Sequence, residues 1–240
     1  MKKFNTSEFI WFFILFMFTL YIYFLLSTGK MSLYIHPKMI KYSAFSFVVL
    51  GELTIVQFFK IFSVKTRNRF KNGYMLFLMA LVLGVFFAPG GLNSDISKKK
   101  GVTFVSSGNI ENIAAHSHEE GEVIEGNEII FSEKNYIHYL EDLGKNLDKH
   151  IGKKIKITGF ILKDDSLSDK EFVITRMLIN CCAADSQVLG IRAKWSNAED
   201  LEEDQWVIVE GTVSSEDKNA VILVQRLKII DKPSNPYVYE

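Results

Sequence analysis

Residues 9–26 read Phe-Ile-Trp-Phe-Phe-Ile-Leu-Phe-Met-Phe-Thr-Leu-Tyr-Ile-Tyr-Phe-Leu-Leu, a run of 18 residues without a charged side chain. At about 1.5 Å of rise per residue, a helix of this length nearly crosses a hydrocarbon core of roughly 30 Å. Backbone amides inside lipid have no water to bind, so we expect a helix there. The run is longer than the apolar core of a signal peptide, and Ser27–Met31 offers no small-x-small cleavage site. We therefore predict a retained anchor over about residues 9–27.

Two weaker apolar stretches follow this anchor. Residues 42–60 include Glu52 and several other polar side chains, and residues 74–89 form a short stretch that ends at Pro89-Gly90-Gly91. A short span can be accommodated by local thinning of the bilayer at modest cost. We predict three transmembrane helices, and the competing interpretation is two spans with one interfacial helix.

Charge divides the chain into two halves. Its 28 basic and 28 acidic side chains cancel, but residues 1–100 hold 13 Lys/Arg against three Asp/Glu, and residues 101–240 hold 15 against 25. This asymmetry excludes a single soluble globule. The two cysteines are adjacent, which excludes a disulfide-stapled miniprotein. We expect a membrane-embedded region over 1–93, a polar linker over 94–126 and a soluble domain over 127–240.

Basic residues in the short loops predict the orientation. Lys2 and Lys3 precede the first span, and the loop Lys60–Lys71 carries five Lys/Arg. With three spans, both segments lie on the cytoplasmic side and the C-terminal domain lies outside. Lys98–Lys100 would lie outside and so opposes this orientation, because it reduces the excess of basic residues on the cytoplasmic side.

Glu52 is the polar residue of the spans that suggests a mechanism. A carboxylate at mid-span costs about 2.5–3.5 kcal/mol on insertion scales, so it is normally protonated, paired or placed in a polar cavity. Glu52 and Gln57 are candidates for contact with a partner helix. The alternatives are a proton or cation relay, or a protonated Glu52 that hydrogen-bonds Thr54 or Gln57 within its own bundle.

The expected linker contains a histidine pair, His116 and His118, beside Glu119, Glu120 and Glu122. Imidazole and carboxylate groups are zinc ligands, so the pair is a candidate metal site. The alternative is a solvated polar tether, because a flexible segment does not preorganise a coordination sphere.

After Asn127 the sequence changes to the pattern of strands. Alternating or β-branched runs bounded by turn residues predict strands over 153–163, 172–179, 188–194, 206–213 and 220–230. A short helix is expected over 196–203. Gly159 and Gly211 lie inside strands, where glycine permits the sharp coiling of a small closed barrel. We therefore predict a mainly β, OB-like barrel.

A helix should precede these strands. Residues 132–143 place Tyr136, Leu140 and Leu143 on one face, and we expect Ser132 to cap the helix and Gly144 to end it. OB-like barrels often bind nucleic acid. However, the net charge of −10 over residues 101–240 repels phosphates, and such binding depends on Lys/Arg, so we exclude nucleic acid as a partner.

The most specific motif is Cys181-Cys182-Ala183-Ala184-Asp185. Adjacent residues of a regular strand point to opposite faces, so both thiols can ligate one metal only if the strand breaks there. Three interpretations stay open. The cysteines and Asp185 bind a thiophilic metal such as Zn²⁺, they form a strained vicinal disulfide, or they pack as small buried hydrophobes.

The order of features resembles a known family. Apolar spans are followed by His36-Pro37-Lys38-Met39, a tether, an Arg-x-x-Ile-x-Cys-Cys-Ala-Ala-Asp segment at 176–185 and a Trp-Val-x-Val-x-Gly strand. This order resembles the YcgQ-like family of bacterial membrane proteins over nearly the whole chain. The resemblance implies a subunit of a two-component permease that works beside a multi-span permease in the bacterial cell membrane. Zinc-related handling by the family is one suggestion that is consistent with a constellation of Cys, Asp and His.

The motif of that family falls on Arg176, Cys181, Cys182, Ala184 and Asp185 of this chain. Its loop motif falls on His36 and Pro37, which makes His36 a further candidate for partner contact or transport. The His-rich tether is not part of the family pattern, so the resemblance leaves the role of His116 and His118 open.

The leading functional prediction is a non-enzymatic accessory subunit of a two-component permease, with its soluble domain outside. No Gly-rich phosphate loop followed by Lys and Ser/Thr occurs, so energy or a conduit must come from another protein. The alternative is an extracytoplasmic metal-binding or metal-sensing membrane protein, with zinc as the candidate ion. A third hypothesis, a membrane-tethered redox protein, lacks a Cys-x-x-Cys motif.

Overall fold

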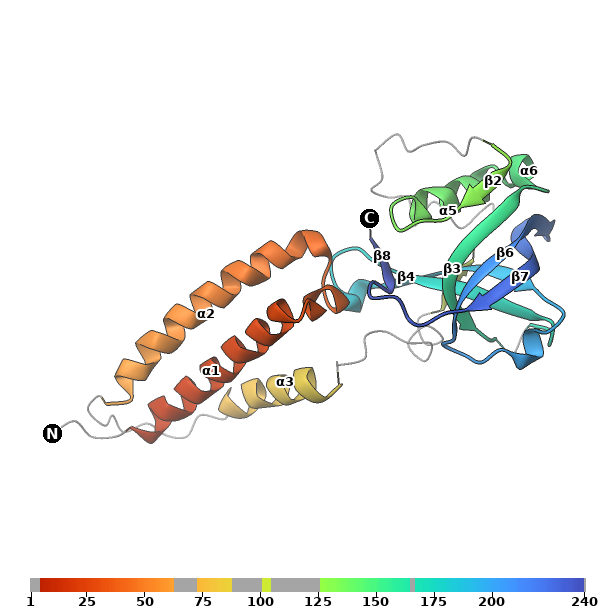
Figure 1. Ribbon diagram of the computed structural model, residues 1–240. Coiled ribbons are helices and arrows are strands. Elements are labelled where there is room, and N and C mark those ends of the chain that lie inside the picture. Colours follow the sequence, from red (N-terminus) through yellow and green to blue (C-terminus); the bar gives the residue numbers. More distant parts are fainter. Residues whose placement is uncertain (1–4, 63–72, 88–100, 105–125, 165–166, 240) are drawn as a thin grey trace. The chain divides into compact units, whose positions relative to one another are not determined.

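The computed structural model describes residues 5–62, 73–87, 101–104, 126–164 and 167–239. The chain divides into a helical unit, Met1–Gly91, and a barrel unit, Leu92–Glu240 (Figure 1). Apolar helices build the first unit and strands build most of the second, which confirms the predicted combination of a membrane-type helical region and an OB-like barrel.

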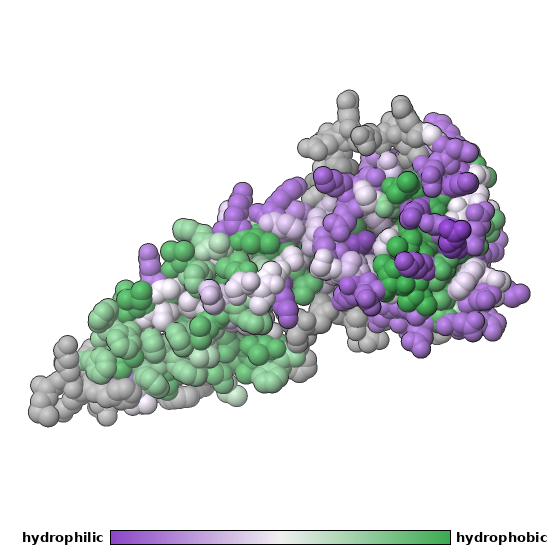
Figure 2. Space-filling model, viewed as in Figure 1, coloured by the Kyte–Doolittle hydropathy of each residue, from purple (hydrophilic) through white to green (hydrophobic). Residues whose placement is uncertain are grey.

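The helical unit contains α1 (Thr6–Ser27), α2 (Ile40–Lys60) and α3 (Gly73–Phe87). By length and composition, α1 and the helical stretch Pro37–Lys60 can each cross a membrane, whereas α3 is a shorter apolar helix. Figure 2 shows that apolar residues cover most of the visible face of this unit. Within the described residues, two helices therefore have spanning length, and a third crossing through α3 stays a prediction.

Helix α1 packs against α2 as an antiparallel hairpin. The rings of Phe12 and Phe58 lie 5.6 Å apart near one end, and those of Tyr23 and Phe47 lie 5.9 Å apart near the other. The pairing is antiparallel because the residue numbers rise along α1 as they fall along α2.

Helix α1 also packs against α3, in parallel. The hydroxyl groups of Ser7 and Tyr74 lie 2.7 Å apart, and the Tyr21 hydroxyl donates a hydrogen bond of 2.7 Å to the Gly84 carbonyl oxygen. An antiparallel α2 followed by a parallel α3 is the arrangement that three successive membrane crossings need.

Five strands close the barrel: β3 (Lys154–Leu162), β4 (Glu171–Ile179), β5 (Gln187–Lys194), β6 (Trp206–Glu216) and β7 (Asn219–Ile229). Their order around the barrel is β3–β4–β5–β7–β6 and back to β3. The β5–β7 pair is parallel and the other pairs are antiparallel. All five predicted strands are confirmed.

Two strand glycines permit this closure. A Cβ atom at Gly159 would lie 2.5 Å from the Thr175 carbonyl oxygen of β4, and one at Gly211 would overlap the Leu223 carbonyl oxygen of β7. Both obstacles are backbone atoms, which cannot move aside as a side chain can. Gly159 and Gly211 lie inside barrel strands as predicted, and the structure adds a reason for glycine at both positions, because the neighbouring strands approach too closely for any side chain.

Three short strands, which sequence analysis did not predict, extend the barrel. They are β1 (Val102–Phe104), β2 (Glu128–Ile130) and β8 (Tyr237–Tyr239), and they pair in parallel with β5, β3 and β4. Each pairs with a stretch of a barrel strand that the adjacent barrel strand does not cover, and so satisfies an otherwise open edge. Strand β1 belongs to the segment expected to be a linker.

The predicted helix over 132–143 forms later in the chain, as α5 (Tyr136–Lys145), followed by α6 (Leu147–His150). Ser132 is not its cap, because the helix begins at Tyr136 with Asn135 at the cap position, and Ser132 lies in the turn before it, where its amide donates to the Asn135 side chain at 2.7 Å. Gly144 is not its end either, because this residue is buried within α5. The expected helix over 196–203 is a short 3₁₀ turn, η5 (Ala198–Asp200).

Candidate functional site

The cysteine pair lies in the turn that joins β4 to β5. The last paired residues of the two strands are Leu178 and Gln187. Cys182 is extended, with φ −153° and ψ 168°, and a 3₁₀ turn, η4 (Ala183–Asp185), follows it. Strand β4 therefore ends before the cysteines. A break of the strand at this point is what both thiols need to reach one metal ion.

Asp185 organises this turn. Its carboxylate accepts hydrogen bonds from the backbone amides of Cys181, at 3.0 Å, and Cys182, at 3.1 Å. In return, the Cys182 side chain accepts from the backbone amide of Asp185. These contacts fold the chain back on itself, so that ligand atoms of Cys181, Cys182 and Asp185 all lie within 4.8 Å of one another.

Hydrogen bonds set the protonation of the turn. The pKa of the Cys181 thiol is raised to about 11, first because the thiol donates to Asp185 and then because of Cys182. Burial would raise the pKa of Asp185, but the bonds from the Cys181 thiol and the two amides outweigh it and lower that pKa. At neutral pH the site therefore holds one carboxylate beside a protonated Cys181.

The donor set suits a thiophilic dication. Two sulfur atoms and one oxygen are ligands that Zn²⁺ takes, and a fourth position would stay open to water or to an incoming ligand. Cys181 is exposed and Cys182 is half-buried, and neither is in a disulfide. Within the described part of the chain, this is the one such group of three or more candidate ligands. His116 and His118 lie outside the described residues.

Arg176 lies on β4, five residues before Cys181. Its guanidinium is buried and donates to the carbonyl oxygens of Asn235, at 3.0 Å, and Pro236, at 3.2 Å. It also lies over the rings of Tyr136 and Trp206, at 5.8 and 5.3 Å from their centroids. The motif arginine thus attaches the C-terminal segment to β4, and its role is structural support of the strand that ends at the cysteines.

His36 acts locally in the helical unit. Its Nδ1 accepts from the Lys38 amide at 2.9 Å, and it caps the 3₁₀ turn η2 (Pro37–Met39) that leads into α2. Proline is favoured at the first position of a helix because it needs no amide partner. The His-Pro loop therefore has a capping role, and a transport role for His36 stays a prediction.

Glu52 and Gln57 differ in their surroundings. The Gln57 amide donates to the Glu8 carboxylate at 2.5 Å, and so joins the end of α2 to the start of α1. Thr54 contacts Thr19 of α1. Glu52 is exposed on α2, and among the described residues no hydrogen bond or ion pair to it is found. The bond to Thr54 or Gln57 considered above is therefore not formed.

Comparison with known sequences identifies the family. The profile of the DUF1980 N-terminal domain matches residues 10–103, and that of the DUF1980 C-terminal domain matches residues 109–240. The chain belongs to the DUF1980 family. The UPF0703 protein YcgQ of Bacillus subtilis (strain 168) is 23% identical over 273 residues, which cover 92% of this chain and 96% of that protein. The predicted membership of a YcgQ-like family is confirmed.

A solved structure also resembles part of this DUF1980 protein. It is the small single-stranded DNA-binding protein from Streptomyces coelicolor, with 14% sequence identity and a TM-score of 0.24. The similarity covers 35% of this chain and 96% of that one.

The helical unit also has a groove between α1 and α3, lined by Tyr21, Lys30 and Gly84 among others, which was not predicted from the sequence. The sequence did carry a signal for the polar end of this groove, because Lys30 and Tyr34 closely follow an apolar span. Such residues mark the membrane–water interface.

Proposed function

We propose that this DUF1980 protein is a membrane-anchored, non-enzymatic subunit of a transport complex, and that its barrel unit binds a thiophilic dication such as Zn²⁺ outside the membrane. The observation that carries the proposal is the cysteine turn, in which ligand atoms of Cys181, Cys182 and Asp185 lie within 4.8 Å of one another. A buried packing role for the cysteines does not agree with an exposed Cys181.

An exposed site with three protein ligands suits capture and release. Structural zinc sites are closed by four protein ligands, whereas sites with three keep an exchangeable position. A donor or acceptor group could occupy that position while the ion passes to or from a permease.

The membrane part of the proposal rests on the helical unit. Two helices have the length and composition to span a bilayer, and α3 runs parallel to α1 as a third crossing would. Glu52 supports a partner helix, because an exposed, unpaired carboxylate at mid-span is costly in lipid unless another protein covers it. We assign this contact to a multi-span permease in the bacterial cell membrane, with the N-terminus cytoplasmic and the barrel unit outside.

Metal analysis of the purified full-length protein tests the site. We expect about one Zn²⁺ per chain, lost in Cys181→Ser/Cys182→Ser and strongly reduced in Asp185→Asn. Asp148→Asn is the matched control, because Asp148 is an exposed carboxylate on α6. Equal metal content in the control and all site variants, or none in the wild type, would remove the metal assignment.

Thiol labelling tests the topology. In a Cys181→Ser/Cys182→Ser background, Ser215→Cys introduces a single exposed thiol into the barrel unit. We expect an impermeant thiol reagent to label it on intact cells. Labelling only after lysis would place the barrel unit in the cytoplasm and overturn the proposed arrangement.

Co-purification tests the partner. In mild detergent we expect a multi-span permease to remain with the wild-type chain and to be weakened by Glu52→Leu. A chain that is solitary in native mass spectrometry would argue against a subunit role. Full solubility without detergent would remove the anchor itself.

A further inference from the structure

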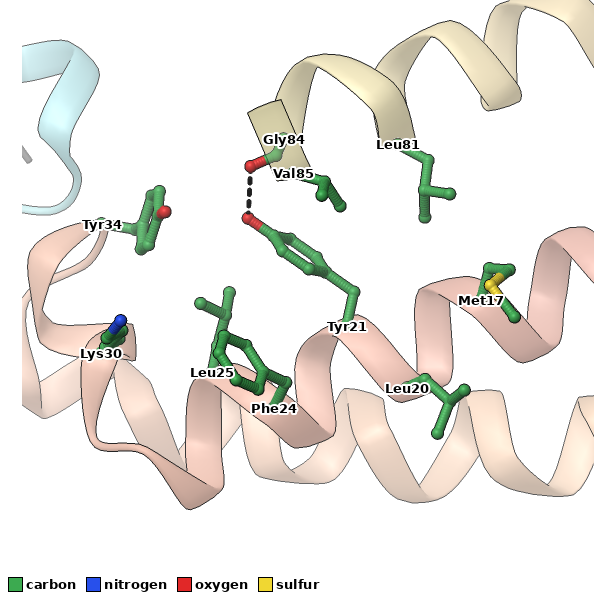
Figure 3. A pocket seen from close by; sticks show the side chains of 10 residues that line it. All are labelled: Met17, Leu20, Tyr21, Phe24, Leu25, Lys30, Tyr34, Leu81, Gly84 and Val85. Atoms are coloured by element: carbon green, nitrogen blue, oxygen red, sulfur yellow. Dashed lines mark hydrogen bonds between the residues drawn. The ribbon is translucent and has the colours of Figure 1, made fainter. Parts of the chain in front are cut away.

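A groove of about 310 Å³ lies between α1 and α3. Figure 3 shows that Tyr21 reaches across it from α1 to Gly84 of α3, with Lys30 and Tyr34 beyond one side of the ring and Met17 beyond the other. The hydrogen bond of 2.7 Å from the Tyr21 hydroxyl to the Gly84 carbonyl oxygen joins the two helices here. The groove therefore has a bonded bridge as well as packed walls.

The lining of the groove is amphipathic. Its ten residues are mostly apolar, and Lys30 is the one charged residue among them. The Lys30 ammonium lies 5.8 Å from the centre of the Phe24 ring, at the end of α1. An apolar slot with one cation at its end matches a ligand that has an apolar chain and an anionic head.

The sequence around Lys30 has the same sign of charge. The segment Thr28–Lys41, which runs from the end of α1 into the first turn of α2, contains Lys30, Lys38 and Lys41 and no Asp or Glu. Lysines close to a membrane surface attract anionic lipid headgroups. The groove and this segment therefore favour the same class of ligand.

We infer that the groove binds one anionic phospholipid, with an acyl chain between α1 and α3 and the phosphate at Lys30. This inference rests on the membrane location proposed above. A helix about 10–12 Å wide does not fit a cavity of this size. Cavities that hold small ligands begin at about 300 Å³. The lipid stabilises the contact of α3 with α1, since it packs against both helices.

Native mass spectrometry of the full-length protein in detergent tests the inference. Dioleoyl-phosphatidylglycerol and dioleoyl-phosphatidylcholine serve as probes, because they share acyl chains and differ in net charge. We expect the wild type to bind the phosphatidylglycerol about fivefold more tightly. Lys30→Gln should abolish this preference, and Lys41→Gln, outside the lining, should retain most of it.

Gly84→Leu tests the apolar part. A Cβ atom at Gly84 would make an ordinary contact of 3.5 Å with the Tyr21 ring, which lines the groove, so the further atoms of leucine should take up space beside that ring. We expect at least a fivefold loss of binding for both lipids. Gly51→Leu is the matched control, because a Cβ atom at this helical glycine of α2 meets nothing within 4 Å.

Equal affinity of the wild type for the two lipids, or unchanged binding by Gly84→Leu, would overturn the inference. If Gly84→Leu instead released a co-purified chain without changing lipid binding, the groove would be a protein contact and the inference would also fail. Zinc content and detergent dependence are measured on the same samples. If the lipid test fails while the protein still binds zinc and still needs detergent, the proposed function stands. If zinc binding and the need for detergent are absent, the proposed function fails whatever the lipid test shows.

Discussion

The helical unit and the barrel unit use apolar residues in different ways. In the described part of α1, only Ile14 and Leu25 are buried, although most residues of the helix are apolar. In β4, by contrast, every residue from Phe172 to Ile179 is buried. Many apolar side chains of the helical unit are exposed, where lipid or a partner could contact them, while those of the barrel unit are buried in its own core. Hydrophobic side chains therefore give the first unit an apolar surface, whereas they build the core of the second.

The two units also differ in how their polar side chains make contacts. In the helical unit they join helix to helix singly, as Gln57 joins Glu8 and Tyr21 joins Gly84. In the barrel unit one buried cation, Arg176, holds several carbonyl oxygens and two rings. Changes in the barrel unit should therefore affect folding, and changes in the helical unit should affect association.

The largest effect is expected from Gly159→Val in the barrel unit. The new side chain collides with the β4 backbone, so we expect a loss of about 3 kcal/mol or more in unfolding free energy. Gly51→Val in α2, where space is open, should cost under about 1 kcal/mol. Thermal unfolding followed by circular dichroism gives both values. Equal costs would contradict the difference drawn between the units.

Arg176→Met should come next. It leaves buried carbonyl oxygens of the C-terminal segment without a donor, and we expect a loss of about 2–4 kcal/mol. Arg192→Met is the matched control, because Arg192 makes an ion pair of 3.2 Å with a largely exposed Glu216 and should cost about 0.5 kcal/mol. Hydrogen exchange at Tyr237–Tyr239 should accelerate in Arg176→Met alone. Unchanged exchange there would argue against attachment by Arg176.

A smaller effect concerns the pH dependence of zinc binding. The pKa of Cys181 is raised to about 11, so its proton must leave when the metal binds. Because the pKa of Asp185 is lowered, this carboxylate is already ionised near neutral pH. It therefore adds nothing to the change of metal affinity with pH there. Between about pH 6 and pH 8, affinity should rise at least tenfold per pH unit, and Cys181→Ser should reduce this slope. A competition titration with a chelator at each pH measures the zinc affinity. An affinity that does not change with pH would contradict the assignment of Cys181 as a ligand.

The smallest effect on stability is expected from Glu52→Gln. Because Glu52 makes no bond within the described residues, the isolated chain should change by less than about 0.5 kcal/mol. Gln57→Leu, which breaks the bond to Glu8, should cost about 1 kcal/mol and serves as the contrast. Unfolding in detergent measures both variants. A large loss in Glu52→Gln would show that Glu52 has a partner within its own unit.

Local pattern explains which parts of the fold could be predicted. Ile155, Ile157 and Ile161 alternate in sequence and are at most 2% exposed, because one face of β3 turns inward. Strands β1, β2 and β8 have three residues each, too few for a period, and exist because open edges of longer strands need partners. Ser132 is not the cap because the helix starts later, at Tyr136, after a turn in which the Ser132 amide donates to the Asn135 side chain.

The sequence by itself determined that an apolar region is joined to an acidic barrel, where its five strands lie, and which glycines allow closure. These properties follow from hydropathy and side-chain size, which each residue carries wherever it lies. Only the tertiary structure decided that Cys181 and Cys182 meet Asp185, that Gln57 turns inward while Glu52 stays exposed, and that a groove ends at Lys30. These depend on backbone direction in a turn and on contacts between residues distant in sequence, which local pattern does not encode.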